Sequence, residues 1–420
     1  MTDQKNTILA ILLSAVLLIG WQYFFGIPQM EKQKQAAELQ RQQQQQQQQQ
    51  SQTQSQTTPA PAGTGGPANA PASTNGAQAP SAPGAAPAPP TPATRDAIVS
   101  TRPRVNIETP RLQGSIALKG ARLDDLSLTQ YRETVDPKSP AIVLLAPLGS
   151  PHPFYAEFGW VAAAGSNVKL PNTDTVWRQE GSGTLGIGKP VTLAFDNGEG
   201  LVFRRTIAVD DQYLFTLKDT VTNNTGAPVT LYPYGLISRH GTPKIEGFYI
   251  LHEGIVGVLG DQGLQEIGYH TLEEKKTLNF KVTNAWFGIT DKYWAATLLP
   301  EITEPLQVRF SAGLLGANKT YQTDYLADAR VIAPNATAET QGRLFAGAKE
   351  VSVVGINFGP FGEGGYNKAL NLNKFDLLID WGWFYFITKP MFWLIDHLYK
   401  LLGNFGLAIL ATTVIVKAFF

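Results

Sequence analysis

Short runs that alternate apolar and polar residues dominate the middle of the chain, and they are rich in Val, Ile, Thr, Tyr and Phe. Residues 191–195 and 201–209 are two such runs, separated by Asp196-Asn197-Gly198, and this pattern predicts a β-hairpin. Similar runs cover residues 105–109, 213–222, 229–236 and 278–283. Helical periodicity begins only at Asn373. The pattern therefore predicts a large antiparallel β domain over residues 96–372, too long for a minimal immunoglobulin sandwich and large enough for an extended two-sheet one.

An apolar segment near the start of the chain, residues 7–27, predicts a transmembrane helix, with residues 1–6 ahead of it. A cleaved signal peptide is the alternative, but it would need small residues after the apolar region. Trp21, Tyr23, Phe24 and Phe25 stand there instead. We therefore predict an uncleaved signal anchor, whose orientation the flanking lysines and arginines do not fix.

Residues 28–95 are predicted to form a disordered linker. Residues 42–94 hold no Asp, Glu, Lys or Arg, and nine glutamines lead into a stretch of Ala, Pro, Gly, Ser and Thr. Such a composition offers too little apolar surface to offset the entropy of ordering the chain. A polyglutamine coiled coil is the alternative to a plain spacer.

Residues 373–402 combine aromatic side chains with an amphipathic helical pattern, and Pro390 stands where a helix can begin. One helical face collects Met391, Leu394, Ile395, Leu398 and Leu402, and the other Lys389, Trp393, Asp396, His397 and Lys400. Aromatic rings favour the headgroup boundary of a bilayer, so the pattern predicts a helix that lies on a membrane. The residues predicted to contact the interface are Trp381, Trp383, Phe384, Tyr385, Phe386, Met391, Leu394, Ile395 and Leu398. An ordinary amphipathic helix packed on the β domain is the alternative.

Residues 403–420 predict the start of a second transmembrane helix. From Phe405 to Phe420 the only ionisable side chain is that of Lys417. Because a helical crossing needs about 20 residues, we expect this span to continue beyond Phe420.

Composition removes several function classes. The chain has 34 basic and 34 acidic residues, so no net charge draws it to nucleic acid. It has no cysteine, which excludes disulfides, thiolate zinc sites and cysteine nucleophiles within this sequence. His152, His240, His252 and His270 fall in the β region without a recognisable acid–base pairing.

Particular motifs carry a family resemblance, which covers the whole chain apart from the linker. They are MTDQKNTILAILLSAVLLIGWQYF at the start, VNIETPRLQGSIALKGARLDDLSLTQY from Val105, NAWFGITDKYWAATLLP from Asn284, RLFAGAKE from Arg343, and DWGWFYFITKPMFWLIDHLYKLLGNFGLAILATTVIVK from Asp380. With this order of segments, the chain resembles the YidC-type membrane protein insertases of Gram-negative bacteria.

The resemblance implies a multi-pass protein of the bacterial inner membrane, with residues 1–6 in the cytoplasm. It implies a periplasmic β-supersandwich similar to galactose mutarotases, a helix on the periplasmic membrane face, and a core of five membrane helices that begins at about Phe405. The family inserts and folds inner-membrane proteins, alone or with the Sec translocon and its SecD–SecF complex, without a cofactor and without enzymatic activity. The partners that the resemblance implies are therefore nascent membrane proteins, these Sec components and lipid. The ribosome is a further implied partner, and it would bind segments beyond Phe420.

Lys417 is the residue to which the resemblance gives a mechanistic role. Thirteen residues separate it from Asn404, which at about 1.5 Å each would place it roughly 20 Å into the bilayer. In the family a basic residue at this place, usually Arg, projects into a hydrophilic groove. Here it is Lys, which keeps the charge but not the planar bidentate donor. A lysine that snorkels to the inner headgroups is the alternative.

Two other function classes stay open on the sequence. A membrane-anchored carbohydrate-binding or sugar-epimerising enzyme would suit a mutarotase-like fold, although fold alone cannot transfer chemistry. A tethered scaffold that docks secretion partners would need no groove charge.

Overall fold

The computed structural model describes residues 81–84, 93–243, 251–316, 318–356, 364–382 and 384–419. All of them belong to one compact unit, Gly76–Phe420. The predicted signal anchor at residues 7–27 lies outside the described residues, as do most of the predicted linker and Trp383.

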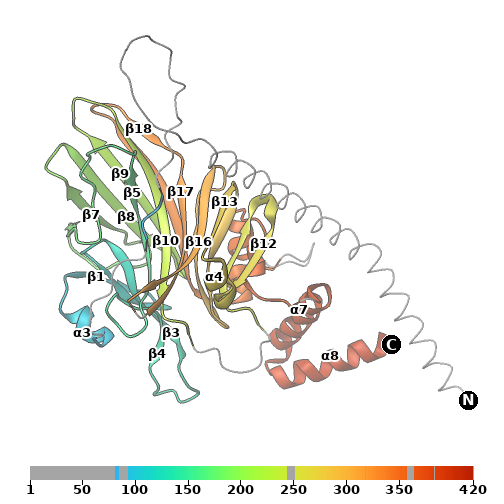
Figure 1. Ribbon diagram of the computed structural model, residues 1–420. Helices are drawn as coiled ribbons and strands as arrows, with labels where there is room; N and C mark the ends of the chain where they lie inside the picture. The colour runs from blue at the N-terminus through green and yellow to red at the C-terminus, as the bar shows by residue number, and fades with distance from the viewer. Residues whose placement is uncertain are drawn as a thin grey trace, which may run out of the picture. The chain divides into compact units, whose positions relative to one another are not determined.

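Two antiparallel sheets form the body of this unit (Figure 1). The first, called here the large sheet, has the order β1 (Arg104–Glu108), β2 (Leu112–Ala117), β3 (Arg122–Arg132), β5 (Phe154–Ala162), β10 (Val229–His240), β17 (Asn318–Ala327), β16 (Leu306–Leu315) and β13 (Thr277–Val282). Two strands lie off this path, β4 (Ala141–Leu145) beside β3 and β18 (Arg330–Ile332) beside β10.

The second sheet has the order β12 (Leu264–Gly268), β11 (Gly254–Leu259), β14 (Ala285–Thr290), β15 (Trp294–Leu299), β19 (Thr337–Ala348), β9 (Leu214–Asn223), β8 (Leu201–Val209), β7 (Val191–Asp196) and β6 (Arg178–Glu180). This architecture confirms the predicted antiparallel β class.

The predicted hairpin forms as β7 and β8, with Val191 opposite Ile207 and Asp196 opposite Val202. Along β8 every second residue is buried, as the alternating sequence pattern requires. The Asn197 side chain closes the turn, because its Oδ1 accepts hydrogen bonds from the backbone N–H groups of Glu199 and Leu201. The other predicted runs also lie in strands, namely β1, β9, β10 and β13.

The main core lies between the two sheets and is lined by aromatic rings. Phe287 on β14, in the second sheet, packs on Phe310 and Tyr325 of the large sheet. Arg205, on β8, also joins the sheets, because its guanidinium pairs with Asp219 and donates to the backbone oxygen of Phe158 on β5. Both partners are buried, so removing only one of them would leave an uncompensated buried charge, which is costly.

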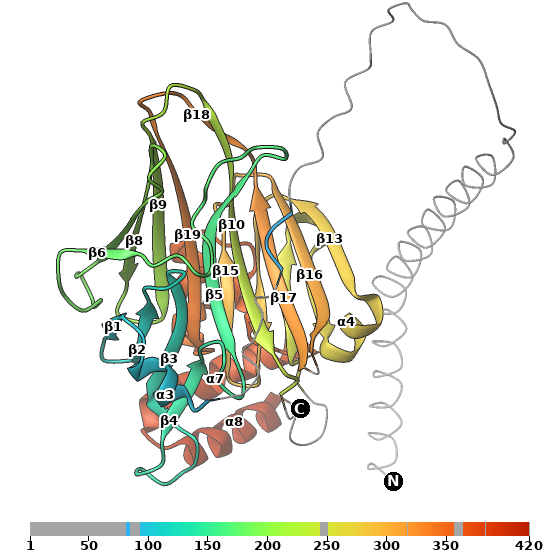
Figure 2. The same cartoon turned by 60° about the vertical axis from the view of Figure 1, so that its left-hand side comes forward.

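Short helices border the sheets: α3 (Arg95–Ser100), α4 (Tyr269–Lys275), η2 (Gly260–Gln262), α5 (Val351–Val354), α6 (Gly365–Ala369) and η4 (Phe375–Leu378). Two longer helices follow, α7 (Tyr385–Leu402) and α8 (Phe405–Phe419) (Figure 2). The described residues thus place the longest helices after the β domain, as the sequence predicts.

Two expectations need correction. Pro390 does not open the amphipathic helix, since α7 begins at Tyr385 and holds Pro390 within its second turn. The expected linker is not free of contacts throughout, because Ala82 is buried against the large sheet. Composition predicts that a segment lacks a core of its own, but it does not predict whether a few residues bind to a neighbouring domain.

Candidate functional site

The last two helices form a hairpin, called here the terminal hairpin (α7 and α8), whose turn is set by Gly403 and Asn404. Gly403 has φ of 67°, a left-handed conformation that ends α7, and its N–H donates to the backbone oxygen of Tyr399 at 2.8 Å. Asn404 then caps α8, because its side-chain oxygen accepts from the N–H of Leu407 at 3.1 Å. These two residues therefore end α7 and begin α8.

Small residues are buried within the terminal hairpin. Ala408 and Thr412, one turn apart on α8, are almost fully buried, whereas most other described residues of α8 are exposed. Close to the turn, the rings of Tyr399 and Phe405 meet with centroids 6.0 Å apart. Small side chains let two helices approach closely, which is a common mode of packing for helices in membranes.

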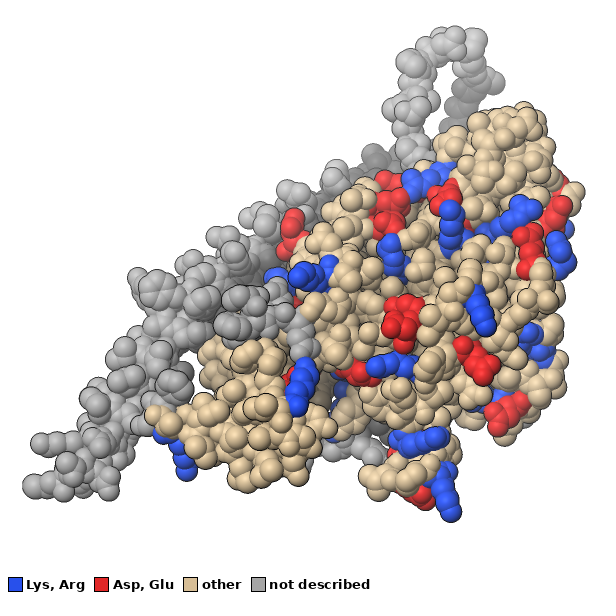
Figure 3. Space-filling model, turned by 180° about the vertical axis from the view of Figure 1, so that it is seen from behind, with Lys and Arg blue, Asp and Glu red and all other residues tan. Residues whose placement is uncertain are grey.

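The remaining surface of the terminal hairpin is strongly apolar. Its exposed large hydrophobic residues are Phe384, Tyr385, Phe386, Ile387, Phe392, Tyr399, Leu401, Leu402, Phe405, Leu407, Ile409, Leu410, Val414 and Ile415. In Figure 3 this end of the molecule is largely tan, while Lys, Arg, Asp and Glu are scattered over the β domain. A contiguous apolar surface of this kind marks a site that contacts another apolar partner or a membrane.

The predicted interface residues and Lys417, the predicted groove charge, differ in their exposure. Phe384, Tyr385 and Phe386 are more than half exposed. The residues on the predicted apolar face of α7, namely Met391, Leu394, Ile395 and Leu398, are partly buried. Lys417 is exposed in the last turn of α8.

Trp381 does not fit the predicted interface role. It is only 8% exposed, its indole N–H donates to the backbone oxygen of Asp376 at 2.9 Å, and its ring packs edge-on against Phe392. Its ring is therefore used to attach α7 to the β domain and is not available to a surface.

A buried ion pair lies at this attachment. Lys389, in the second turn of α7, places its ammonium group 2.5 Å from Asp376 of η4, with the two residues 8% and 1% exposed. The same ammonium lies 5.6 Å from the centre of the Trp381 ring. Thr388 adds a hydrogen bond to the backbone oxygen of Trp381 at 2.7 Å. These contacts, named here the elbow (Asp376, Trp381, Thr388 and Lys389), fix the direction in which α7 leaves the β domain.

The β domain in turn fixes η4. The ring of Phe375 packs edge-on against Trp286 and Phe345, both from the second sheet, and Trp286 donates its indole N–H to the backbone oxygen of Asn373. Asn367 of α6 accepts hydrogen bonds from the N–H groups of Phe375 and Asp376. The elbow is therefore continuous with the main core.

Sequence reasoning missed the elbow. It assigned Lys389 to the polar face of an interfacial helix, whereas the structure buries it against Asp376. The two residues are 13 apart in the sequence, a spacing typical of neither a helix nor a hairpin. The only available signal was a lysine inside an otherwise aromatic and apolar stretch.

The four histidines of the β domain occupy separate environments. His152 is exposed, and His270 lies 3.5 Å from Glu274 on the exposed side of α4. His252 contacts the backbone oxygen of Ile255, whereas His240 is buried near the ring of Tyr155. Within the described residues, no group of His, Asp and Glu side chains is arranged to hold a metal ion.

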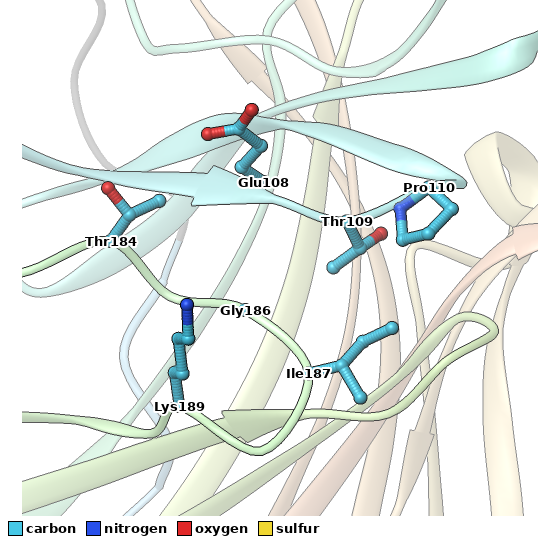
Figure 4. A pocket seen from close by; sticks show the side chains of 7 residues that line it. All are labelled: Glu108, Thr109, Pro110, Thr184, Gly186, Ile187 and Lys189. Atoms are coloured by element: carbon cyan, nitrogen blue, oxygen red, sulfur yellow. The ribbon is translucent and has the colours of Figure 1, made fainter.

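A pocket of about 260 Å³ opens beside the turn between β1 and β2 (Figure 4). Its lining includes the exposed side chains of Glu108, Ile187 and Lys189. Binding pockets usually hold a few fixed polar groups inside an apolar wall. Because these charged groups are exposed, the pocket provides weaker grounds for a site than the terminal hairpin does.

In the described part of the chain, no helix has both the length and the apolar character needed for a complete membrane crossing.

Comparison with known proteins gives consistent matches. The family model described as the YidC periplasmic domain matches residues 104–394. A protein of Nitrobacter hamburgensis is 60% identical across the whole chain, and one of Bradyrhizobium diazoefficiens is 57% identical, both named "Membrane protein insertase YidC". The chain spans 64% and 66% of the lengths of these two relatives.

Solved structures show a more distant likeness. A galactose mutarotase-like protein from Lactobacillus casei aligns with 58% of this chain and 100% of its own, at 11% identity and a TM-score of 0.39. A putative aldose 1-epimerase from Escherichia coli K12 aligns with 59% of this chain and 99% of its own, at 10% identity and a TM-score of 0.37.

Proposed function

The chain belongs to the YidC family, and on this premise we propose that it acts in the insertion and folding of bacterial inner-membrane proteins. In this proposal the β domain is periplasmic, α7 lies on the periplasmic face of the membrane, and α8 enters the bilayer. The domain bounds are those predicted above, with residues 1–6 in the cytoplasm and residues 7–27 as the signal anchor.

The exposed apolar surface of the terminal hairpin is the observation that carries this proposal. Phe384, Tyr385 and Phe386 expose aromatic rings at the start of α7, where α7 is attached to a polar domain. Such rings favour the headgroup region, which supports a position of the elbow at the membrane surface. On α8, Leu407, Leu410 and Val414 are exposed and suit contact with hydrocarbon.

Lys417 then lies in the bilayer. It stands twelve residues after Phe405, about 18 Å along the helix at about 1.5 Å per residue. A charge at such a depth is costly unless it faces water or a partner. We infer that it faces a hydrated groove, where it lowers the cost of moving polar parts of a client protein through the membrane.

The partners follow from this role. They are nascent inner-membrane proteins and lipid, together with the Sec translocon, its SecD–SecF complex and the ribosome. The function as proposed needs no cofactor and no catalytic residue, so we assign the β domain no enzymatic role.

Complementation tests the groove. The native protein is depleted from cells, full-length variants are supplied, and protease protection follows two clients, one with a charged translocated tail and one that is purely apolar. Lys417→Arg should keep both activities, because the charge is retained. Lys417→Ala and Lys417→Glu should impair the charged client more than the apolar one. Equal insertion of both clients by Lys417→Ala would contradict the groove role.

A compartment reporter tests the layout independently. Fused at Asn371, ahead of the elbow, it should report the periplasm. A cytoplasmic signal at that position would contradict the orientation and the depth of Lys417 together.

A further inference from the structure

A short piece of the linker, Ser81–Gly84, lies against the face of the large sheet that points away from the main core. Side chains alternate between the two faces of a strand. On β10, Ile237 belongs to the main core, whereas Tyr234 and Leu236 belong to a separate cluster that includes Ala82. The short blue segment in Figure 2 crosses the large sheet at this place.

Ala82 fills a closed apolar site. Its side chain is only 6% exposed, in a cluster with Tyr155 of β5, Tyr234 and Leu236 of β10, and Leu326 of β17. A small side chain fits there, but a bulky one would have to displace rings that are themselves buried.

Two side chains bind the backbone of the segment. Arg309 of β16 donates through Nη2 to the backbone oxygens of Ala82 at 2.8 Å and Pro83 at 3.2 Å. Gln322 of β17 donates through Nε2 to the oxygen of Pro83 at 2.7 Å. These hydrogen bonds bind backbone oxygens, so they do not depend on a particular side chain.

Asp324 holds both donors in place. Its Oδ2 accepts from Arg309 at 3.0 Å and from Gln322 at 2.8 Å, and Asp324 is 2% exposed. Arg309 and Asp324 are directly opposite in the register of β16 and β17. Because a buried carboxylate fixes both donors, the site is preorganised and is not a chance contact of flexible side chains.

Proline suits this site for a physical reason. Pro83 has no N–H, so it leaves no donor unpaired against the sheet. Its fixed φ also reduces the entropy lost when an extended segment binds. The site therefore favours a small residue followed by proline, a combination that the linker repeats.

We propose that this face of the large sheet is a binding site for an Ala–Pro segment. Ser81–Gly84, from the linker of the same chain, occupies it. Only residues 85–92 separate the segment from Ala93, whose N–H donates to the backbone oxygen of Gly149. Such a short connection gives the segment a high effective concentration at the site.

Thiol labelling of the 420-residue chain in detergent tests the site, since this sequence has no cysteine. Ala82→Cys should react with a maleimide at least tenfold more slowly than Gly84→Cys, because Gly84 is exposed with open space at its Cβ position. Equal rates at the two positions would overturn the proposal.

Release of the segment should remove this difference. With Ala82→Cys as the reporter, Arg309→Gln should raise the labelling rate to that of Gly84→Cys. The matched control is Arg330→Gln, since Arg330 is also paired with a carboxylate beside β10 but does not touch the segment. It should leave the rate slow.

A linker variant covers the case in which Arg309→Gln disturbs the sheet. Pro83→Asp adds a carboxylate close to Asp324 without altering the β domain, and it too should make Ala82→Cys react quickly. Persistent slow labelling in this variant would mean that Arg309, Gln322 and Asp324 do not hold the segment, and the proposal would fail.

Discussion

The ammonium nitrogen of Lys389 lies 2.5 Å from Oδ2 of Asp376, and this buried ion pair joins α7 to the β domain. Asp376 belongs to η4, which packs on the main core through Phe375. The start of α7 is thus attached to the main core through a buried charged contact. In the proposed function, this contact sets the angle at which the terminal hairpin meets the membrane.

Removing one member of this pair should be strongly destabilising. Asp376→Ala leaves the Lys389 ammonium buried without its counter-charge, which typically costs about 3–5 kcal/mol of unfolding free energy. The double variant Asp376→Leu with Lys389→Met should recover most of that loss, because no charge remains buried. Chemical unfolding in detergent, followed by tryptophan fluorescence, measures both.

Asp396→Ala is the matched control for Asp376→Ala. Asp396 pairs with Lys400 at 2.6 Å on the same helix, but Lys400 is about half exposed. Pairs of this kind contribute about 0.3–0.5 kcal/mol. If Asp376→Ala were as mild as Asp396→Ala, the elbow would not depend on its ion pair.

The sequence predicted the strands well because their signal is local. Alternation and turn residues such as Asp196-Asn197-Gly198 belong to a single hairpin and need no information from elsewhere. The elbow could not be predicted in this way, because Trp381 and Phe384 are both aromatic and only the tertiary fold buries one and exposes the other. Ala82 docks in a pocket formed by three strands that are far apart in the sequence. The composition of the linker carries no information about that pocket.

Gly403 should resist substitution by residues that disfavour a left-handed backbone. Its φ of 67° and the open space at its Cβ position mean that alanine would be strained but would not clash. We expect Gly403→Ala to cost about 1 kcal/mol. Hydrogen exchange at residue 403, whose N–H bonds to Tyr399, should then be about fivefold faster. Gly403→Asn should change it less, because asparagine tolerates this conformation, and an equal effect of both would argue against a conformational cause.

Ala408 should be intolerant of larger side chains. It is fully buried within the terminal hairpin, so Ala408→Leu should force α7 and α8 apart at a cost of about 1–3 kcal/mol. Spin labels at Leu401 and Leu410, both exposed, can report the separation of the helices. Thr413→Leu is the control, since Thr413 is exposed on the same helix. A distance distribution unchanged by Ala408→Leu would show that the helices do not pack through this residue.

His240 should make the β domain less stable in acid. Burial lowers its pKa to about 4 from the ordinary histidine value of 6.5, with a smaller contribution from the positive charge of Arg122. Between these two values the unfolded chain binds a proton that the folded chain does not, so the free energy of unfolding falls as the pH drops through that range. From pH 7 to pH 5 this one group should remove about 2 kcal/mol.

Comparing variants isolates that contribution, because other groups titrate in every variant alike. His240→Gln should lose about 2 kcal/mol less than the parent between pH 7 and pH 5, whatever its stability at pH 7. His270→Gln should follow the parent, since the side chain of His270 is 85% exposed. Chemical unfolding at the two pH values supplies the numbers. If the parent and His240→Gln lost the same stability on acidification, His240 would have to titrate alike in the folded and unfolded chains, and burial could not be what controls its charge.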